Sequence, residues 1–99
     1  MLTRDGVLEI IFRALNNLND EMGPDDKFDV TPTTKLFGAD ATLDSLALVS
    51  VIVDVEGDVS SALDRSISLT DDRAMSQKIS PFDDVQTLLN YIMELVNEA

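Results

Sequence analysis

Apolar residues near the amino terminus recur every three or four positions, which is the spacing of one face of an α-helix. They are Val7, Ile10, Ile11, Ala14, Leu15 and Leu18. Thr3 and Asp5 are available to cap this predicted helix, and its end should fall near residues 19–23. A long loop is expected from about Gly23 to Leu43, because Gly and Pro at this density break both helix and strand. Large apolar side chains within the loop indicate that it lies over the core: Phe28, Val30, Leu36 and Phe37.

The segment from about Asp44 to Glu56 is rich in β-branched residues, whose propensity favours a strand. Its periodicity is helical instead, because a strand would place Leu48 and Val51 on opposite faces. A helix over this segment carries two neighbouring apolar stripes. The first consists of Leu48, Val51, Ile52, Val55 and Val59, and the second of Leu46, Val49 and Val53.

Residues 57–69 are expected to form a loop, and Thr70 is expected to cap a short helix that runs to about Gln77. The last helix should open with Ser80 as its cap, Pro81 in the first helical position and Asp83 as the acid of a capping box. Its apolar stripe consists of Phe82, Val85, Leu88, Leu89, Ile92 and Val96, and Phe37 and Tyr91 are further core candidates. The chain is therefore expected to be an all-α bundle of three longer helices, one short helix and a long first loop.

The composition fits a single small domain that spans residues 1–99. Hydrophobic residues make up 44% of the chain, which is enough for a globular core. No apolar run approaches the roughly 20 residues that span a bilayer, and the first ten residues hold no apolar signal core. We therefore expect a cytoplasmic protein.

The charge and the missing residue types exclude several functions. Nineteen acids against seven bases give a net charge of -12, which disfavours nucleic acid and membrane surfaces and favours partners with basic patches. The chain has no His and no Cys, so it lacks the parts of the common nucleophilic triads and the usual zinc ligands. Its clustered acids do not fit the calcium-binding loop, so no metal site is expected. We expect a protein on which enzymes act, not an enzyme.

The sequence Leu43-Asp44-Ser45-Leu46 places an acid and a serine where a loop meets a helix. The first backbone N–H groups of a helix have no partner within it, and together with the helix dipole they favour an anion. A phosphodiester on Ser45 would lie in this field, and Asp44 would cap the helix or help hold a metal ion during phosphate transfer. Asp and Ser are also the commonest N-caps, so capping alone explains the same residues.

The wider pattern resembles the acyl carrier protein family. The resemblance rests on Leu36-Phe37-Gly38, on LDSLALVSVIVDVE and on the closing stretch SISLTDDRAMSQKISPFDDVQTLLNYI, and it covers most of the chain. It implies a four-helix bundle with a long loop between the first two helices. It also implies that Ser45, in the motif Asp44-Ser45-Leu46, carries a 4'-phosphopantetheine arm. A phosphopantetheinyl transferase would attach this arm from coenzyme A with Mg²⁺, assisted by Asp44.

The resemblance also implies the partners. The arm would supply the thiol that the chain lacks and carry acyl groups as thioesters. A loading ligase for acyl or aminoacyl groups, and downstream synthase or transferase enzymes with basic docking patches, would act on a monomeric carrier. Leu46, Val49, Val53 and Glu56 would bind these partners, unless both apolar stripes belong to the core.

Some features depart from the family pattern. Ser45 comes seven residues after Gly38, where the common fatty-acid carriers have a spacing of three, and the connection after the second helix is extended. The second helix offers Asp54, Glu56 and Asp58 where the family usually shows a denser row of acids. These departures point to a dedicated pathway. Two alternatives stay open: an aminoacyl or peptidyl carrier, and an unmodified acidic interaction module.

Overall fold

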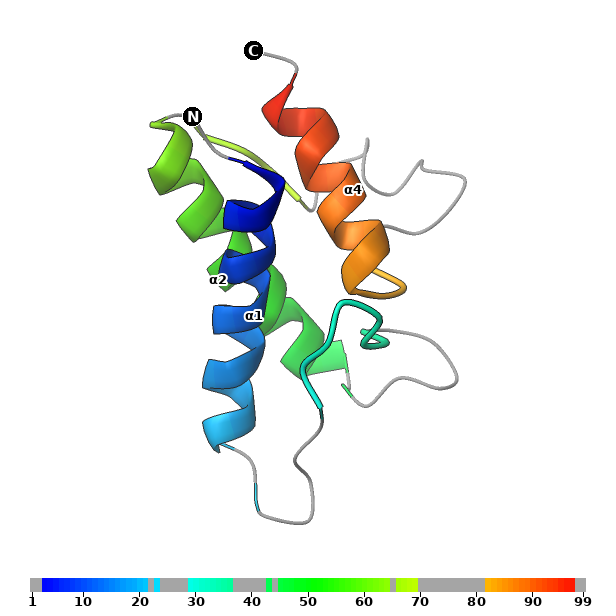
Figure 1. Cartoon of the computed structure of the whole chain (residues 1–99). Coiled ribbons are helices and arrows are strands. Elements are labelled where there is room, and N and C mark those ends of the chain that lie inside the picture. The colour runs from blue at the N-terminus through cyan, green and yellow to red at the C-terminus, as the bar shows by residue number, and fades with distance from the viewer. Residues whose placement is uncertain are drawn as a thin grey trace.

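The computed structural model describes residues 3–21, 23, 29–36, 43, 45–64, 66–69 and 82–97. Its helices are α1 (Arg4–Glu21), α2 (Ser45–Leu63) and α4 (Val85–Val96) (Figure 1). Apart from one isolated β-bridge, the regular structure of these residues is helical, which confirms the predicted all-α class for them. The short helix expected from Thr70 to Gln77 lies outside the described residues.

Helix α1 is the element that both other helices contact. It runs beside α4 in the opposite direction and crosses in front of α2 (Figure 1). The buried side chains include nearly all members of the three predicted core stripes; Leu18 and Phe82 are partly buried. The buried apolar residues are Val7, Ile10, Ile11, Ala14, Leu15, Leu36, Leu43, Leu48, Val51, Ile52, Val55, Val59, Leu69, Val85, Leu88, Leu89, Tyr91, Ile92 and Val96.

The start of α1 follows the sequence prediction. The Thr3 Oγ1 atom accepts a hydrogen bond of 3.1 Å from the Gly6 N–H, and the Thr3 carbonyl accepts one of 2.9 Å from the Val7 N–H. Thr3 is therefore the residue that caps this helix. On the side chain of Arg4, Nη2 donates to Asn90 Oδ1 at 2.9 Å, which ties the first turn of α1 to α4.

Helix α2 is longer than the sequence predicts. The expected helix ends at Glu56, whereas the observed one continues to Leu63, so the expected loop over residues 57–69 is wrong for its first half. The prediction gave too much weight to Gly57 and the serines after it. Burial of Val59, which extends the core stripe by one turn beyond Val55, outweighs their poor helix propensity.

The start of α4 is also corrected. Its N-cap is Asp84, whose backbone is extended (φ -151°, ψ 178°), so the helix begins at Val85, after the predicted opening at 80–83. Asp84 Oδ1 accepts a 2.8 Å hydrogen bond from the Thr87 N–H, and Thr87 Oγ1 accepts one of 3.0 Å from the Asp84 N–H. Phe82 lies in a turn before the helix and packs against the core. The predicted cap, Ser80, and Pro81 lie outside the described residues.

The reason for the late start is a tertiary contact with residues 29–36. Lys35 and Asp84 form an antiparallel β-bridge, in which the Leu36 N–H donates to the Asp83 carbonyl at 2.8 Å and the Val85 N–H donates to the Thr34 carbonyl at 3.0 Å. Residues paired in this way must be extended, so a helix cannot include Asp84. Leu36 is fully buried, as expected of a loop laid over the core, whereas Phe28 and Phe37 lie outside the described residues.

Within the described residues, none of the helices combines the length and the apolar character that crossing a membrane requires.

Candidate modification site and the exposed face of α2

Ser45 is the first residue of α2, so it occupies the joint between loop and helix that the sequence indicates. Leu43, two residues earlier, is buried and anchors the chain as it enters the helix. The first turn of α2 contains no acidic residue, so the positive end of the helix dipole is not neutralised within that turn. A helix start of this kind favours a negatively charged group near its first backbone N–H groups. Asp44, predicted to assist modification, lies outside the described residues.

The two apolar stripes of α2 have different environments. Every member of the stripe that contains Leu48 and Val55 is buried. Leu46, Val49 and Val53 are 80%, 55% and 57% exposed, which makes them the exposed large apolar side chains of the described residues. Burial of both stripes is therefore excluded. We call Leu46, Val49 and Val53 the exposed stripe; it begins next to Ser45 and follows the helix for two turns.

Glu56, which was predicted to bind partners, is half-buried and makes a contact within the protein. Its Oε2 atom accepts a hydrogen bond of 2.8 Å from the Leu69 N–H. One turn further on, Ser60 Oγ accepts one of 3.0 Å from the Ile67 N–H. These two side chains hold residues 66–69, which we call the strap, against α2. Sequence reasoning missed this role because it treated the acids of α2 as surface charges.

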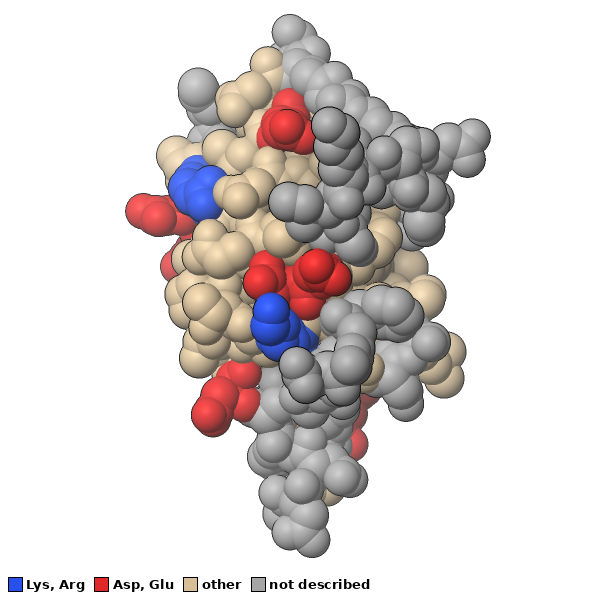
Figure 2. Space-filling view, turned by 90° about the vertical axis from the view of Figure 1, so that its right-hand side faces the viewer, with Lys and Arg blue, Asp and Glu red and all other residues tan. Residues whose placement is uncertain are grey.

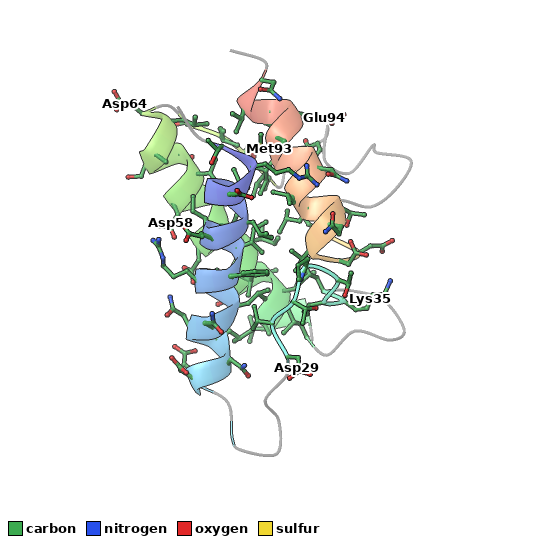
Figure 3. The ribbon with its side chains drawn as sticks, in the orientation of Figure 1. Asp29, Lys35, Asp58, Asp64, Met93 and Glu94 are labelled. Carbon is green, nitrogen blue, oxygen red and sulfur yellow. The ribbon has the colours of Figure 1, made fainter. Side chains whose placement is uncertain are left out.

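Acidic side chains lie on α2 and on the face that carries α4. Asp54 is exposed and Asp58 is half-buried on α2, and Figure 3 shows Asp58 on this helix and Asp64 just beyond its carboxyl-terminal end. Figure 2 shows acidic side chains distributed over the face on which α4 lies. In the part of the chain that the structure describes, no three acids gather closely enough to hold a metal ion. The acids therefore set the sign of the surface potential and form no cation site there.

A shallow hollow of about 300 Å³ lies on the outer side of α1. Its described lining comes from this single helix and consists of Glu9, Phe12, Arg13, Asn16 and Asn17. An active-site cleft usually gathers polar groups from several elements. The described lining residues of this hollow all lie on α1, so they do not form such a cleft.

Comparisons of this chain with protein-family models, with curated proteins and with solved structures find no match. The resemblance to the acyl carrier protein family therefore stays a prediction from the sequence.

Proposed function

We propose that this chain is a discrete acyl carrier protein that is modified with 4'-phosphopantetheine on Ser45. The observation that carries the proposal is the Asp-Ser-Leu tripeptide of an acidic helical protein, in which the serine is the first residue of a helix. Serines at helix starts are common because they cap helices, so the weight of the proposal comes from the whole tripeptide in an acidic helical chain, at a helix start whose free backbone N–H groups favour an anion. The proposed fold is the complete four-helix bundle of that family, and the proposed location is the cytoplasm.

The chemistry of attachment is a phosphoryl-type transfer carried out by a phosphopantetheinyl transferase. The Ser45 hydroxyl oxygen bonds to the phosphorus that bears the pantetheine group of coenzyme A. The bond between that phosphorus and the bridging pyrophosphate oxygen breaks, the adenosine bisphosphate leaves, and the serine proton is released. Asp44 would help to hold Mg²⁺, which would supply positive charge beside the phosphate oxygens. Ser45 is the acceptor in this reaction and not a catalyst.

The exposed stripe supplies the partner surface in this proposal. Exposed aliphatic side chains such as Leu46 and Val53 lose contact with water when a partner covers them, which favours association. The net charge of -12 speeds encounter with a loading ligase, synthase or transferase whose docking patch is basic. The thiol of the arm then carries acyl intermediates between these enzymes as thioesters. An aminoacyl or peptidyl cargo would use the same site.

A second candidate is an unmodified interaction module. The observation that favours it is the exposed stripe itself, because an apolar stripe on an acidic helix is sufficient to bind a basic partner. This candidate predicts salt-sensitive binding to one protein and no covalent change.

The test is the intact mass of the chain before and after incubation with coenzyme A, Mg²⁺ and a broad-specificity phosphopantetheinyl transferase. We expect the mass to rise by one phosphopantetheine, mapped to the peptide that contains Ser45. Ser45→Ala should abolish the gain and keep the helical circular dichroism spectrum. Ser50→Ala, which changes an exposed serine on the same helix, should be modified like the parent chain. A mass gain on the Ser45→Ala protein would show that the site is wrong, and no gain on the parent chain would favour the unmodified module.

A further inference from the structure

The strap is held by side chains and not by a backbone ladder. After α2 the chain turns at Asp64, whose φ of 54° is left-handed, and residues 66–69 then return alongside the helix. Figure 1 shows them leaving the far end of α2 and running toward α4. The acceptors are on Glu56 and Ser60, which are four residues apart, about 6 Å along the helix axis. The donors on Ile67 and Leu69 are two residues apart, about 6.6 Å in an extended chain, so the two spacings match closely.

The same two acceptors lie on the helix face that carries the exposed stripe. Positions 46, 49, 53, 56 and 60 follow one another at spacings of three and four, which places them on one face of α2. The amino-terminal half of this face is bare, with Leu46 80% exposed. The carboxyl-terminal half bears the strap, whose Leu69 side chain is buried in the hydrophobic core, whereas Ser66 and Ser68 are exposed. One continuous face is thus open at one end and covered by the chain's own strap at the other.

Glu56 lies where the exposed stripe meets the strap. Its carboxylate follows Val53 directly on the shared face and accepts the Leu69 N–H with one oxygen. A cationic side chain competes well for this carboxylate, because a guanidinium or ammonium group is a stronger donor to it than a neutral backbone amide. Two of the described cationic side chains are engaged elsewhere: Arg4 donates to Asn90 on α4, and Lys35 lies 3.8 Å from Asp84.

We propose that the strap is an intramolecular cover on the docking face of α2, and that a cationic partner side chain at Glu56 releases it. The proposal rests on the proposed function in taking the exposed stripe as the docking face. In the free chain the strap limits the open face to the two turns next to Ser45. A partner that also engages Glu56 displaces the Leu69 N–H, and the carboxyl-terminal half of the face becomes available to it. The phosphopantetheinyl transferase is expected to be such a partner.

The first experiment measures amide hydrogen exchange in the free chain. Glu56→Ala should raise the exchange rate of the Leu69 amide about tenfold, and Ser60→Ala should raise that of Ile67 about fivefold. The matched controls are Asp54→Ala, which removes an exposed acid from the same helix, and Ser61→Ala, which changes the exposed serine that follows Ser60. The controls should change both rates less than about twofold. The Ile92 amide, in the core of α4, reports any loss of global stability.

If the Ile67 and Leu69 amides exchange at the same rates in Glu56→Ala and Ser60→Ala as in their controls, the proposal is overturned. Should Glu56→Ala lower global stability, Glu56→Gln provides the second variant, because its amide oxygen keeps an acceptor without the charge. It should give a Leu69 rate between those of the parent chain and Glu56→Ala.

The second experiment adds the phosphopantetheinyl transferase and coenzyme A to the Ser45→Ala chain, in which the complex cannot react. We expect the exchange rate of the Leu69 amide to rise at least fivefold on binding, although formation of a complex usually protects amides. Slower or unchanged exchange in a complex detected by size-exclusion chromatography would overturn the release mechanism. Absence of both a complex and modification of the parent chain would instead refute the proposed function, and the release mechanism with it. The rates of the free variants would still show whether Glu56 and Ser60 hold the strap.

Discussion

Gly57 occupies an exposed position in the interior of α2, where a β-carbon would meet no atom within 4 Å. A glycine at such a position costs helix stability because its backbone loses more freedom on folding than that of alanine. Gly57→Ala should therefore raise the free energy of unfolding by about 0.5–1 kcal/mol, measured by urea denaturation. The reverse change at Ala62, an exposed residue in the last turn of α2, should lower it by a smaller amount. A loss of stability in Gly57→Ala would contradict the open surroundings of this position.

Asp64 ends α2 in the left-handed region, with φ at 54°, and its N–H donates to the Ser61 carbonyl at 3.3 Å. Glycine adopts this conformation without strain, whereas a β-branched side chain clashes. Asp64 also places a negative charge beside the negative end of the helix dipole. Asp64→Gly should therefore raise the free energy of unfolding by up to about 1 kcal/mol, and Asp64→Val should lower it by about 1–2 kcal/mol. Asp64→Asn removes only the charge, so chemical denaturation should place it between aspartate and glycine.

At the scale of the element, the start of α4 depends on Asp84, which serves two contacts at once. Its side chain completes the capping box with Thr87, and it lies 3.8 Å from Lys35 Nζ beside the helix start (Figure 3). Asp84→Ala should lower the free energy of unfolding by about 1–2 kcal/mol, since the Thr87 N–H loses its acceptor. Asp84→Asn keeps a capping oxygen and removes the ion pair, so its cost should stay below about 1 kcal/mol. Thermal unfolding that shows equal costs for both variants would mean that the ion pair, not the cap, is the important contact.

Helices α2 and α4 differ from the sequence prediction for one shared reason. Each boundary was inferred from the residues near it, such as Gly57 and the motif at 80–83. The observed boundaries depend on contacts made elsewhere, namely burial of Val59 in the core and pairing of Asp84 with Lys35. The interior periodicity of both helices was predicted well, because every turn of a core-facing stripe repeats the same signal.

For the whole molecule, the excess of acids is the dominant property. A net charge of -12 on a chain of 99 residues makes the folded state repel itself, because folding brings the charges together. Raising NaCl from about 10 mM to about 200 mM shortens the Debye length from roughly 30 Å to less than 10 Å and should raise Tm by a few degrees. MgCl₂ at equal ionic strength should have a similar effect. A larger effect of MgCl₂ that saturates at low concentration would indicate a specific cation site, against expectation.

The candidate site was predictable where its signal is local. The position of Ser45 at the start of a helix follows from the loop before it and the stripe after it, and the structure places it there. The resemblance predicted that Leu46, Val49 and Val53 bind partners, but periodicity alone left their burial open, because a second apolar stripe can be buried or exposed depending on what packs beside it. The role of Glu56 was missed for a similar reason, since its contact lies 13 residues further along the chain.

The sequence by itself determined the helical class, the core stripes, the acidic surface and the serine at a helix start. These properties follow from periodicity, composition and residue type, which act over a few neighbouring positions. Only the tertiary structure decided where α2 and α4 begin or end, which stripe of α2 stays exposed, and which side chains hold the strap. Those features depend on burial and pairing between segments distant in the chain. Such contacts outweigh local propensities of a few tenths of a kcal/mol per residue up to about 1 kcal/mol.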